Sequence, residues 1–239
     1  MRLDRWLAVV AGLSRSQARS AIRSGQVQLQ GQCVRQIAMQ VDPGMQMRWQ
    51  GSDHLFSESA QRYLMYHKPV GEVCSREDAH HPLVFDRWSV AEGQHLMTVG
   101  RLDCDTSGLL LLTTDGQWSQ QLRKPGRHVK TYDVLLHNDL TEIMREQLLG
   151  GVELRGEAGR IQVCWLEQQG DRQVRMGVSE GRYHLVRRLW AAVGNHVVAL
   201  HRSAIGAVVL DEQLAAGHWR DLREDEISLL DVSNSECSK

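Results

Sequence analysis

The pattern of apolar and polar positions predicts two short helices and a small sheet at the start of the chain. Apolar residues recur at helical spacing over residues 3–10. A second helix is predicted over residues 14–25, which begin with a serine in a capping-box pattern and end with a glycine. Alternating apolar residues in 27–34 and 45–49 indicate short strands joined by turns. These elements predict one compact unit over residues 1–50.

Beyond residue 50 the pattern changes, and a mostly polar stretch over 51–62 is predicted to be a linker. Strands are predicted at Tyr63–His67, Met97–Val99, Leu109–Thr113, Val129–Leu136, Ile161–Trp165 and Val174–Val178. Helices are predicted at Thr141–Gly150, at His184–Val193 and after the acidic run 221–226. Strands and helices mix without regular βαβ alternation, so residues 63–239 are predicted to form an α+β domain with a mainly antiparallel sheet.

Charge is unevenly distributed along the 239 residues, although the formal net charge is only −1. Residues 1–36 hold six arginines against one acid, a balance of +5, and residues 211–239 have a balance of −5. The N-terminal unit is therefore the basic module expected to bind nucleic acid. No apolar run is long enough to cross a bilayer and the N-terminus does not resemble a signal peptide, so a cytoplasmic protein is expected.

The arginines of the N-terminal unit are the first candidates for contact with RNA. Arg15, Arg19 and Arg23 are spaced by four within the second predicted helix, opposite its apolar face. The alternative is a surface helix without a partner, but the near absence of acids around it favours phosphate contact. The candidates are Arg2, Arg5, Arg15, Arg19 and Arg23.

A polar loop between two apolar strands is the strongest candidate for chemistry. It contains Arg101, Asp103, Asp105, Thr106 and Ser107. An ionised carboxylate in such a place must be paired or hydrogen-bonded. The alternative is an ordinary polar turn whose side chains satisfy backbone N–H groups.

This loop and four other segments resemble the motifs of the pseudouridine synthases, in the branch that modifies small-subunit ribosomal RNA. Residues 100–108 read G-R-L-D-C-D-T-S-G, like the catalytic motif of that family. Residues 130–132 and 180–188 resemble its second and third motifs. Residues 68–71 and 205–210 resemble stretches at the start and at the closing edge of the same domain. Several motifs in one order are far more specific than any one of them.

The resemblance implies roles for individual residues. Asp103 aligns with the catalytic aspartate, Tyr132 with the tyrosine that packs on the target base, and Arg187 with the basic partner of the aspartate. Residues 1–50 resemble an alpha-L type RNA-binding domain. Further residues expected to contact RNA are Lys68, Arg101, Thr106, Lys130, Arg182 and Arg188.

The expected reaction is the isomerisation of a uridine to pseudouridine at a base flipped out of its stack. It involves no net redox change, so neither a cofactor nor a metal is expected. The five cysteines include no C-x-x-C pair that would indicate zinc. A carboxylate can attack the sugar C1′ or the base C6, or remove the C2′ proton, and the sequence does not choose between these routes.

The resemblance of local runs at 115–119, 180–184 and 194–198 implies a small-subunit target, position 516 of 16S rRNA. The expected partner is ribosomal RNA within a small-subunit assembly intermediate. The protein is expected to be a monomer. One departure is Leu185, where relatives usually have Gln, and a packing change is expected there. The alternatives are a synthase for large-subunit rRNA and a non-catalytic RNA-binding ribosome-assembly factor. A glycosidase is disfavoured because Asp103 and Asp105 are only two residues apart.

Overall fold

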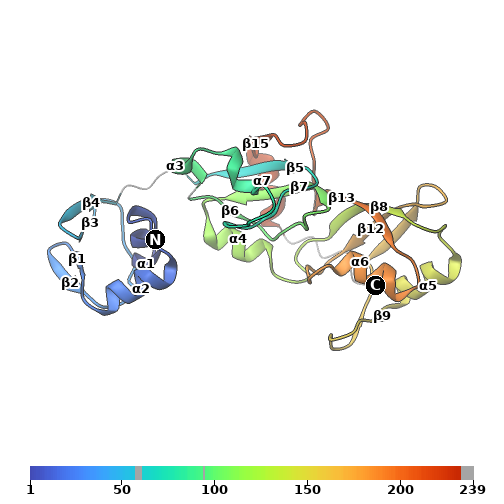
Figure 1. The fold of residues 1–239 in the computed structure, drawn as a ribbon, viewed down its shortest axis with the longest axis horizontal. Helices are drawn as coiled ribbons and strands as arrows, with labels where there is room; N and C mark the ends of the chain where they lie inside the picture. The colour runs from blue at the N-terminus through green and yellow to red at the C-terminus, as the bar shows by residue number, and fades with distance from the viewer. Residues whose placement is uncertain (57–60, 94, 233–239) are drawn as a thin grey trace. The chain divides into compact units, whose positions relative to one another are not determined.

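The chain folds into two compact units, Met1–Ala60 and Gln61–Lys239 (Figure 1). The computed structural model describes residues 1–56, 61–93 and 95–232. Residues 57–60 of the predicted linker and residues 233–239 of the acidic C-terminus therefore lie outside the described residues. No helix in the described part of the chain is long and apolar enough to span a membrane.

The first unit begins with the two predicted helices, α1 (Leu3–Val10) and α2 (Arg15–Arg23). The capping box is confirmed: the Gln17 amide donates to Ser14 Oγ at 3.2 Å, and the Ser14 amide donates to Gln17 Oε1 at 2.8 Å. These bonds satisfy two backbone donors that the first helical turn leaves without partners. The apolar faces of both helices pack into one core with the sheet of this unit.

The sheet of the first unit is antiparallel, with the strand order β2-β1-β3-β4. Its strands are β1 (Val27–Leu29), β2 (Gln32–Val34), β3 (Gln46–Trp49) and β4 (Ser52–Leu55). Strand β4 lies inside the stretch interpreted as a linker, and Phe56 packs in the core of this unit. The first unit therefore extends beyond residue 50, because the chain turns back at Gln50 and Gly51 and pairs again with β3.

The second unit is built on a nine-stranded sheet whose main path is β11-β12-β8-β13-β7-β5-β15, with β14 paired to β13 and β6 to β7. The strands are β5 (Tyr63–Lys68), β6 (Met97–Thr98), β7 (Thr106–Thr113), β8 (Lys130–Leu136), β11 (Trp165–Gln168), β12 (Gln173–Val178), β13 (Val197–Ile205), β14 (Val208–Val209) and β15 (Trp219–Asp221). A separate hairpin pairs β9 (Val152–Glu153) with β10 (Arg160–Ile161). The helical elements are η1 (Val84–Arg87), α3 (Val90–Gly93), α4 (Gly116–Leu122), α5 (Glu142–Gly150), α6 (Leu185–Ala192) and α7 (Glu224–Asp231).

The strand pairing confirms the predicted α+β fold with a mainly antiparallel sheet, because β7 with β13 is the only parallel pair among the strands of the described residues. These two strands approach closely at Gly108. A Cβ atom there would lie 2.6 Å from the amide nitrogen of Arg202, and the φ of Gly108 is +109°. Only glycine meets both conditions without strain. The close approach fixes the beginning of β7, where the polar loop ends.

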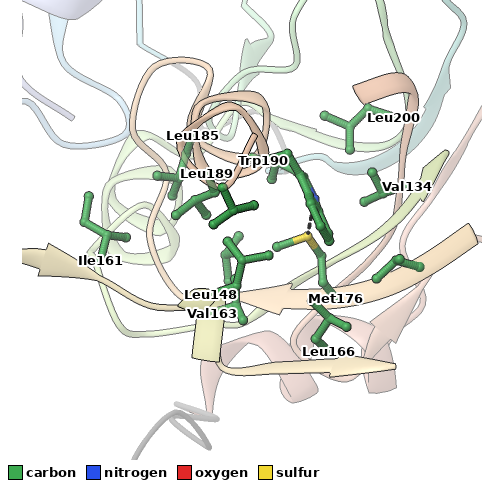
Figure 2. Packing of buried hydrophobic residues seen from close by; sticks show 14 of the residues in the cluster. Val134, Leu148, Ile161, Val163, Leu166, Met176, Leu185, Leu189, Trp190 and Leu200 are labelled. Atoms are coloured by element: carbon green, nitrogen blue, oxygen red, sulfur yellow. Dashed lines mark hydrogen bonds between the residues drawn. The ribbon is translucent and has the colours of Figure 1, made fainter. Parts of the chain in front are cut away.

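Helix α6 packs on the sheet of the second unit and forms its largest core. Figure 2 shows Trp190 of α6 facing Met176 of β12, and the indole N–H donates to the methionine sulfur at 3.3 Å. Leu185 also belongs to this core. The packing change expected at this position stays a prediction. Leu185 and Val186 of the first turn of α6 belong both to this core and to the lining of the pocket described below.

The predicted strand Ile161–Trp165 is wrong. Residues 162–164 are not in a strand, and the chain here leaves β10 and enters β11. Ile161 and Val163 are both buried, so their alternation mimics one strand. The two ends pair with different partners, β9 and β12.

Candidate active site

The polar loop before β7 is held in place by the ammonium group of Lys68. This side chain is fully buried at the end of β5. Its Nζ donates to the carbonyl oxygens of Pro69 and Thr106, each at 2.9 Å, and of Asp103 at 3.1 Å. Burial lowers the pKa of Lys68. The expectation that Lys68 contacts RNA phosphates is wrong, because its charge is enclosed by loop carbonyls and cannot be reached from outside.

The carboxylate of Asp103 faces the N-terminal end of α6. Its Oδ1 lies 3.5 Å from Nε2 of His184, and 29% of the Asp103 side chain remains exposed. His184 is the N-cap of α6 and has a left-handed backbone with φ of 49°, which is uncommon outside glycine. Sequence analysis did not single out His184, although it is part of the third motif. Its conformation turns the imidazole toward Asp103.

Arg187 pairs with Asp105, so the predicted ion pair between Arg187 and Asp103 is wrong. Arg187 Nη2 lies 2.9 Å from Asp105 Oδ2 and also donates to the Asp105 carbonyl at 3.2 Å. Its Nη1 donates to the carbonyl of Val197 at 3.2 Å. The guanidinium therefore joins α6 to the loop two residues beyond Asp103. It positions the loop and adds positive charge near the carboxylate.

A pocket of about 520 Å³ opens over this loop, β8, β13 and the start of α6. Tyr132 of β8 lies between Met176 of β12 and Arg202 of β13 in the sheet register, and it lines the pocket. A pocket of this volume can hold a ligand of nucleoside size. The predicted site residues that line it are Arg101, Asp103, Thr106, Lys130, Tyr132, Arg182 and Arg187.

Two other predicted RNA contacts, Arg182 and Arg188, share one acidic partner. Glu157 lies 2.7 Å from Arg182 Nη1 and 2.8 Å from Arg188 Nη1. Arg182 also pairs with Glu180, while Arg188 donates to a backbone carbonyl at 2.8 Å. Arg188 does not line the pocket. Only Arg182 is thus placed at the pocket, and its charge there is balanced by two acids.

Arg202 is a pocket residue that sequence analysis missed. It is 4% exposed, and its Nε donates to the carbonyl of Leu109 at 2.8 Å. Its Nη2 has no hydrogen-bond partner among the described residues. The signal in the sequence was a lone arginine inside the otherwise largely apolar run 197–205, which here forms β13. A buried cation in such a run is costly unless a ligand or a carbonyl receives its N–H groups.

Lys130 lies near Arg202 and is strongly affected by its surroundings. Burial, reinforced by the positive charge of Arg202, lowers the pKa of Lys130 to about 8. Its ammonium donates to the carbonyl of Ser179 at 3.2 Å. The pocket therefore carries a lysine whose charge changes just above neutral pH.

This shift predicts a measurable dependence of stability on pH. Folded protein releases the Lys130 proton near pH 8, whereas the unfolded chain keeps it until about pH 10.5. Between these values the unfolded state binds more protons, so the free energy of unfolding rises with pH. Relative to Lys130→Met, the free energy of unfolding of wild type should rise by up to about 1.4 kcal/mol per pH unit in this range. Solvent screening at this half-buried group makes the rise smaller. Urea unfolding of both proteins at pH 7, 8.5 and 10 measures the difference, and a constant difference would contradict the shift.

In the first unit, three predicted RNA contacts converge on one acid. Asp4 is fully buried, and its carboxylate lies 3.1 Å from Arg2, 3.1 Å from Arg15 and 3.0 Å from Arg19. Burial alone would raise the pKa of Asp4, but hydrogen bonds from Arg19 and Arg2 and the charge of Arg15 outweigh it and hold this pKa below its usual value. The three guanidinium groups remain about half exposed. They form a fixed cationic cluster with net charge +2.

The other two predicted contacts of this unit lie on the same helices. Arg23 is exposed at the end of α2, and Arg5 is half-buried on α1. Together with the cluster around Asp4, they add positive charge to the two helices of the first unit.

The arrangement at the pocket suits chemistry carried out by a carboxylate. Asp103 lines the pocket together with an aromatic ring and cationic side chains. In the described part of the chain, no group of three or more His, Cys, Asp or Glu side chains is arranged to hold a metal ion. A partly exposed carboxylate in such surroundings can act as a nucleophile or as a base.

Comparison with known proteins assigns most of the chain to two families. Residues 62–192 match the RNA pseudouridylate synthase family, and residues 1–47 match the S4 domain. The chain is 42% identical over 229 residues to the ribosomal small subunit pseudouridine synthase A of Escherichia coli (strain K12), covering 95% of this chain and 99% of that protein. It is 41% identical over 231 residues to the protein of the same name from Haemophilus influenzae, covering 96% and 99%. A crystal structure of a pseudouridylate synthase superimposes with a TM-score of 0.71 at 40% identity, covering 96% and 99%.

Proposed function

Because the chain belongs to the RNA pseudouridylate synthase family, we propose that it isomerises one uridine of small-subunit ribosomal RNA to pseudouridine. The observation that carries this proposal is a pocket of nucleoside size that both Asp103 and Tyr132 line. The names of the relatives support the small subunit as the source of the substrate. Position 516 of 16S rRNA is the target expected from the motifs.

In the proposed reaction the N1–C1′ bond of the uridine breaks, the uracil turns, and a bond forms between C5 and C1′. C5 loses a proton and N1 gains one, so the reaction balances without an oxidant, a reductant or a metal. Asp103 acts at C1′, at C6 or on the C2′ proton. All three routes are compatible with the geometry, because the Asp103 carboxylate lines a pocket that could hold both the sugar and the base of a flipped-out nucleotide.

The other pocket residues have proposed roles that follow from their positions. Tyr132 offers an aromatic face to the extruded uracil, and its hydroxyl can transfer a proton. Arg187 keeps the loop in place through Asp105. Arg101, Lys130 and Arg182 line the pocket and would contact RNA there. Thr106 contributes a buried hydroxyl without a partner among the described residues.

Release of tritium from uridine labelled at C5 tests the proposal, because C5 loses its hydrogen only when pseudouridine forms. Wild-type protein should release one tritium per 16S rRNA molecule, from free rRNA or from precursor 30S particles. Pseudouridine mapping in both rRNAs after deletion of the gene should show one site missing from 16S rRNA. Loss of a site in large-subunit RNA alone would overturn the substrate. No release from any rRNA, with RNA binding intact, would favour a non-catalytic assembly factor.

Three finer points belong to the same proposal. A partly assembled small-subunit particle is the proposed substrate, because recognition by shape needs folded RNA. The protein is proposed to act as a monomer. It is proposed to act in the cytoplasm, where ribosomal RNA is assembled. Activity on particles compared with free rRNA, and the mass of the active species, test the first two.

The arginines of the first unit are proposed to hold RNA phosphates, which predicts a specific change in the dependence of binding on salt. Replacement of Arg15, Arg19 and Arg23 by Gln should weaken RNA binding and flatten the slope of log K against log salt by about 0.7–0.9 for each phosphate that the variant no longer neutralises. The matched control replaces Arg145, Arg172 and Arg175 by Gln, which also removes three charges, all of them outside the pocket in the second unit. Equal slopes for wild type and the triple variant of the first unit would contradict the role of these arginines.

A further inference from the structure

Tyr183 stands out among the aromatic residues because of its exposure. Its side chain is 68% exposed, and no other Phe, Tyr or Trp in the described part of the chain is exposed. Removing water from an aromatic ring is favourable, so a ring exposed at the lining of a pocket is available to stack on a ligand that enters the pocket. The position of Tyr183 is equally specific, because it lines the same pocket as Asp103.

The ring of Tyr183 already has one face occupied. It stacks on the imidazole of His184 with the ring centroids 3.8 Å apart and the planes inclined by 17°. His184 in turn lies 3.5 Å from Asp103. Contacts therefore run from Asp103 through His184 to Tyr183, and all three residues line the pocket.

The backbone holds this pair in place. The left-handed conformation of His184 precedes α6, and the Arg188 amide donates to the His184 carbonyl at 2.9 Å. The next residue, Leu185, is buried in the core beneath α6. Stacking on a pre-formed surface loses less conformational entropy than stacking on a mobile side chain. The outer face of Tyr183 is therefore a prepared platform.

We propose that the outer face of Tyr183 is the stacking site for the nucleobase adjacent to the target uridine. This inference rests on the proposed function, because a uridine in the pocket with its sugar at Asp103 would bring the neighbouring nucleotide toward His184 and Tyr183. An extruded uridine leaves its neighbour without a stacking partner, and Tyr183 supplies a new one. Stacking is tolerant of base identity because every base has a π-face. Exposed Arg101, which also lines the pocket, can receive the intervening phosphate.

Fluorescence of 2-aminopurine tests the platform directly. The base would be placed on the 5′ side or the 3′ side of the target in a 16S rRNA fragment containing uridine 516, and stacking on an aromatic ring quenches its emission. Wild type, Tyr183→Phe and Tyr183→Trp should quench one of the two probes. Tyr183→Ala should not, and its dissociation constant for the fragment should rise roughly 5- to 100-fold. Its single-turnover rate at saturating RNA should fall by a smaller factor than its affinity.

The controls separate this inference from the proposed function. Val209→Ala alters another exposed side chain outside the pocket and should change neither quenching nor affinity. Quenching retained in Tyr183→Ala, or abolished equally in Tyr183→Phe, would overturn the platform while wild type still releases tritium. No tritium release by wild type would instead refute the proposed function. Because Tyr183 is exposed, Tyr183→Ala should have the same midpoint of thermal unfolding as wild type. If Tyr183→Phe, Tyr183→Trp and Tyr183→Ala all had a lowered midpoint and did not bind RNA, the role of the ring would be structural.

Discussion

Asp103→Asn should lower the single-turnover rate of tritium release at least about 10³-fold, the largest effect expected for any substitution in the pocket. The amide has nearly the shape of the carboxylate, but it can neither attack carbon nor accept a proton at neutral pH. The side chain is partly exposed and its nearest ionic contact, with His184, is 3.5 Å long, so removal of its charge should change the free energy of unfolding little. The dissociation constant for rRNA should stay within a few-fold of wild type. Tritium release and filter binding on the same preparations measure both quantities.

Asp105→Asn is the matched control for this prediction. It removes one carboxylate from the same loop and weakens the ion pair that joins the loop to Arg187. A partial loss of rate is expected, because Asp103 keeps its charge but its loop is held less firmly. If Asp105→Asn were inactive and Asp103→Asn active, the two carboxylates would have to exchange roles. Equal rates in Asp103→Asn and wild type would rule out a carboxylate mechanism at this position.

The parts of the fold that the sequence predicted correctly depend on local signals. The helices α1 and α2 follow from the spacing of apolar residues and from a capping box formed within four residues. Strand β4 gave no such signal, because its residues are mostly exposed and it forms only by pairing with β3. The predicted strand at 161–165 failed for a similar reason, since two buried residues alternate there although the flanking residues pair with different strands. Pairing partners are nonlocal and leave little trace in a short window.

The candidate site shows the same division. The motifs predicted that Asp103, Tyr132 and Arg187 lie together, and all three line one pocket. The sequence did not specify which charge meets which, so the partner of Arg187 was assigned wrongly. Burial of the cationic side chains was also not predicted. Lys68 was expected to contact RNA but is buried, and Arg202 was not singled out but lies in an apolar strand and lines the pocket. The type of a residue predicts which chemistry its side chain can perform. Its burial and its ionic partners depend on contacts between segments that are distant in the sequence.

Lys68→Met should lower the free energy of unfolding of the second unit by about 2–5 kcal/mol, because the carbonyls of Pro69, Asp103 and Thr106 lose a shared donor inside the protein. Methionine has a similar length but no N–H group, so all three oxygens lose this donor, and the Asp103 carbonyl keeps the bond from the Thr106 amide. Urea unfolding measures this loss. The exposed Lys124→Met, which also removes one lysine charge, should change stability by less than about 0.5 kcal/mol.

The same substitution should also reduce activity, through the geometry of the loop rather than through RNA binding. The amide of Thr106, which donates to the Asp103 carbonyl at 3.1 Å, should exchange its hydrogen faster once the ammonium no longer holds that carbonyl. Tritium release should fall by about 10- to 100-fold, since displacement of a reacting group by about 1 Å can cost about 100-fold. The affinity for rRNA at low salt should remain close to that of wild type, because the charge of Lys68 is enclosed. A large loss of affinity with unchanged stability would instead mean that this lysine reaches a phosphate, contrary to its burial beneath the loop.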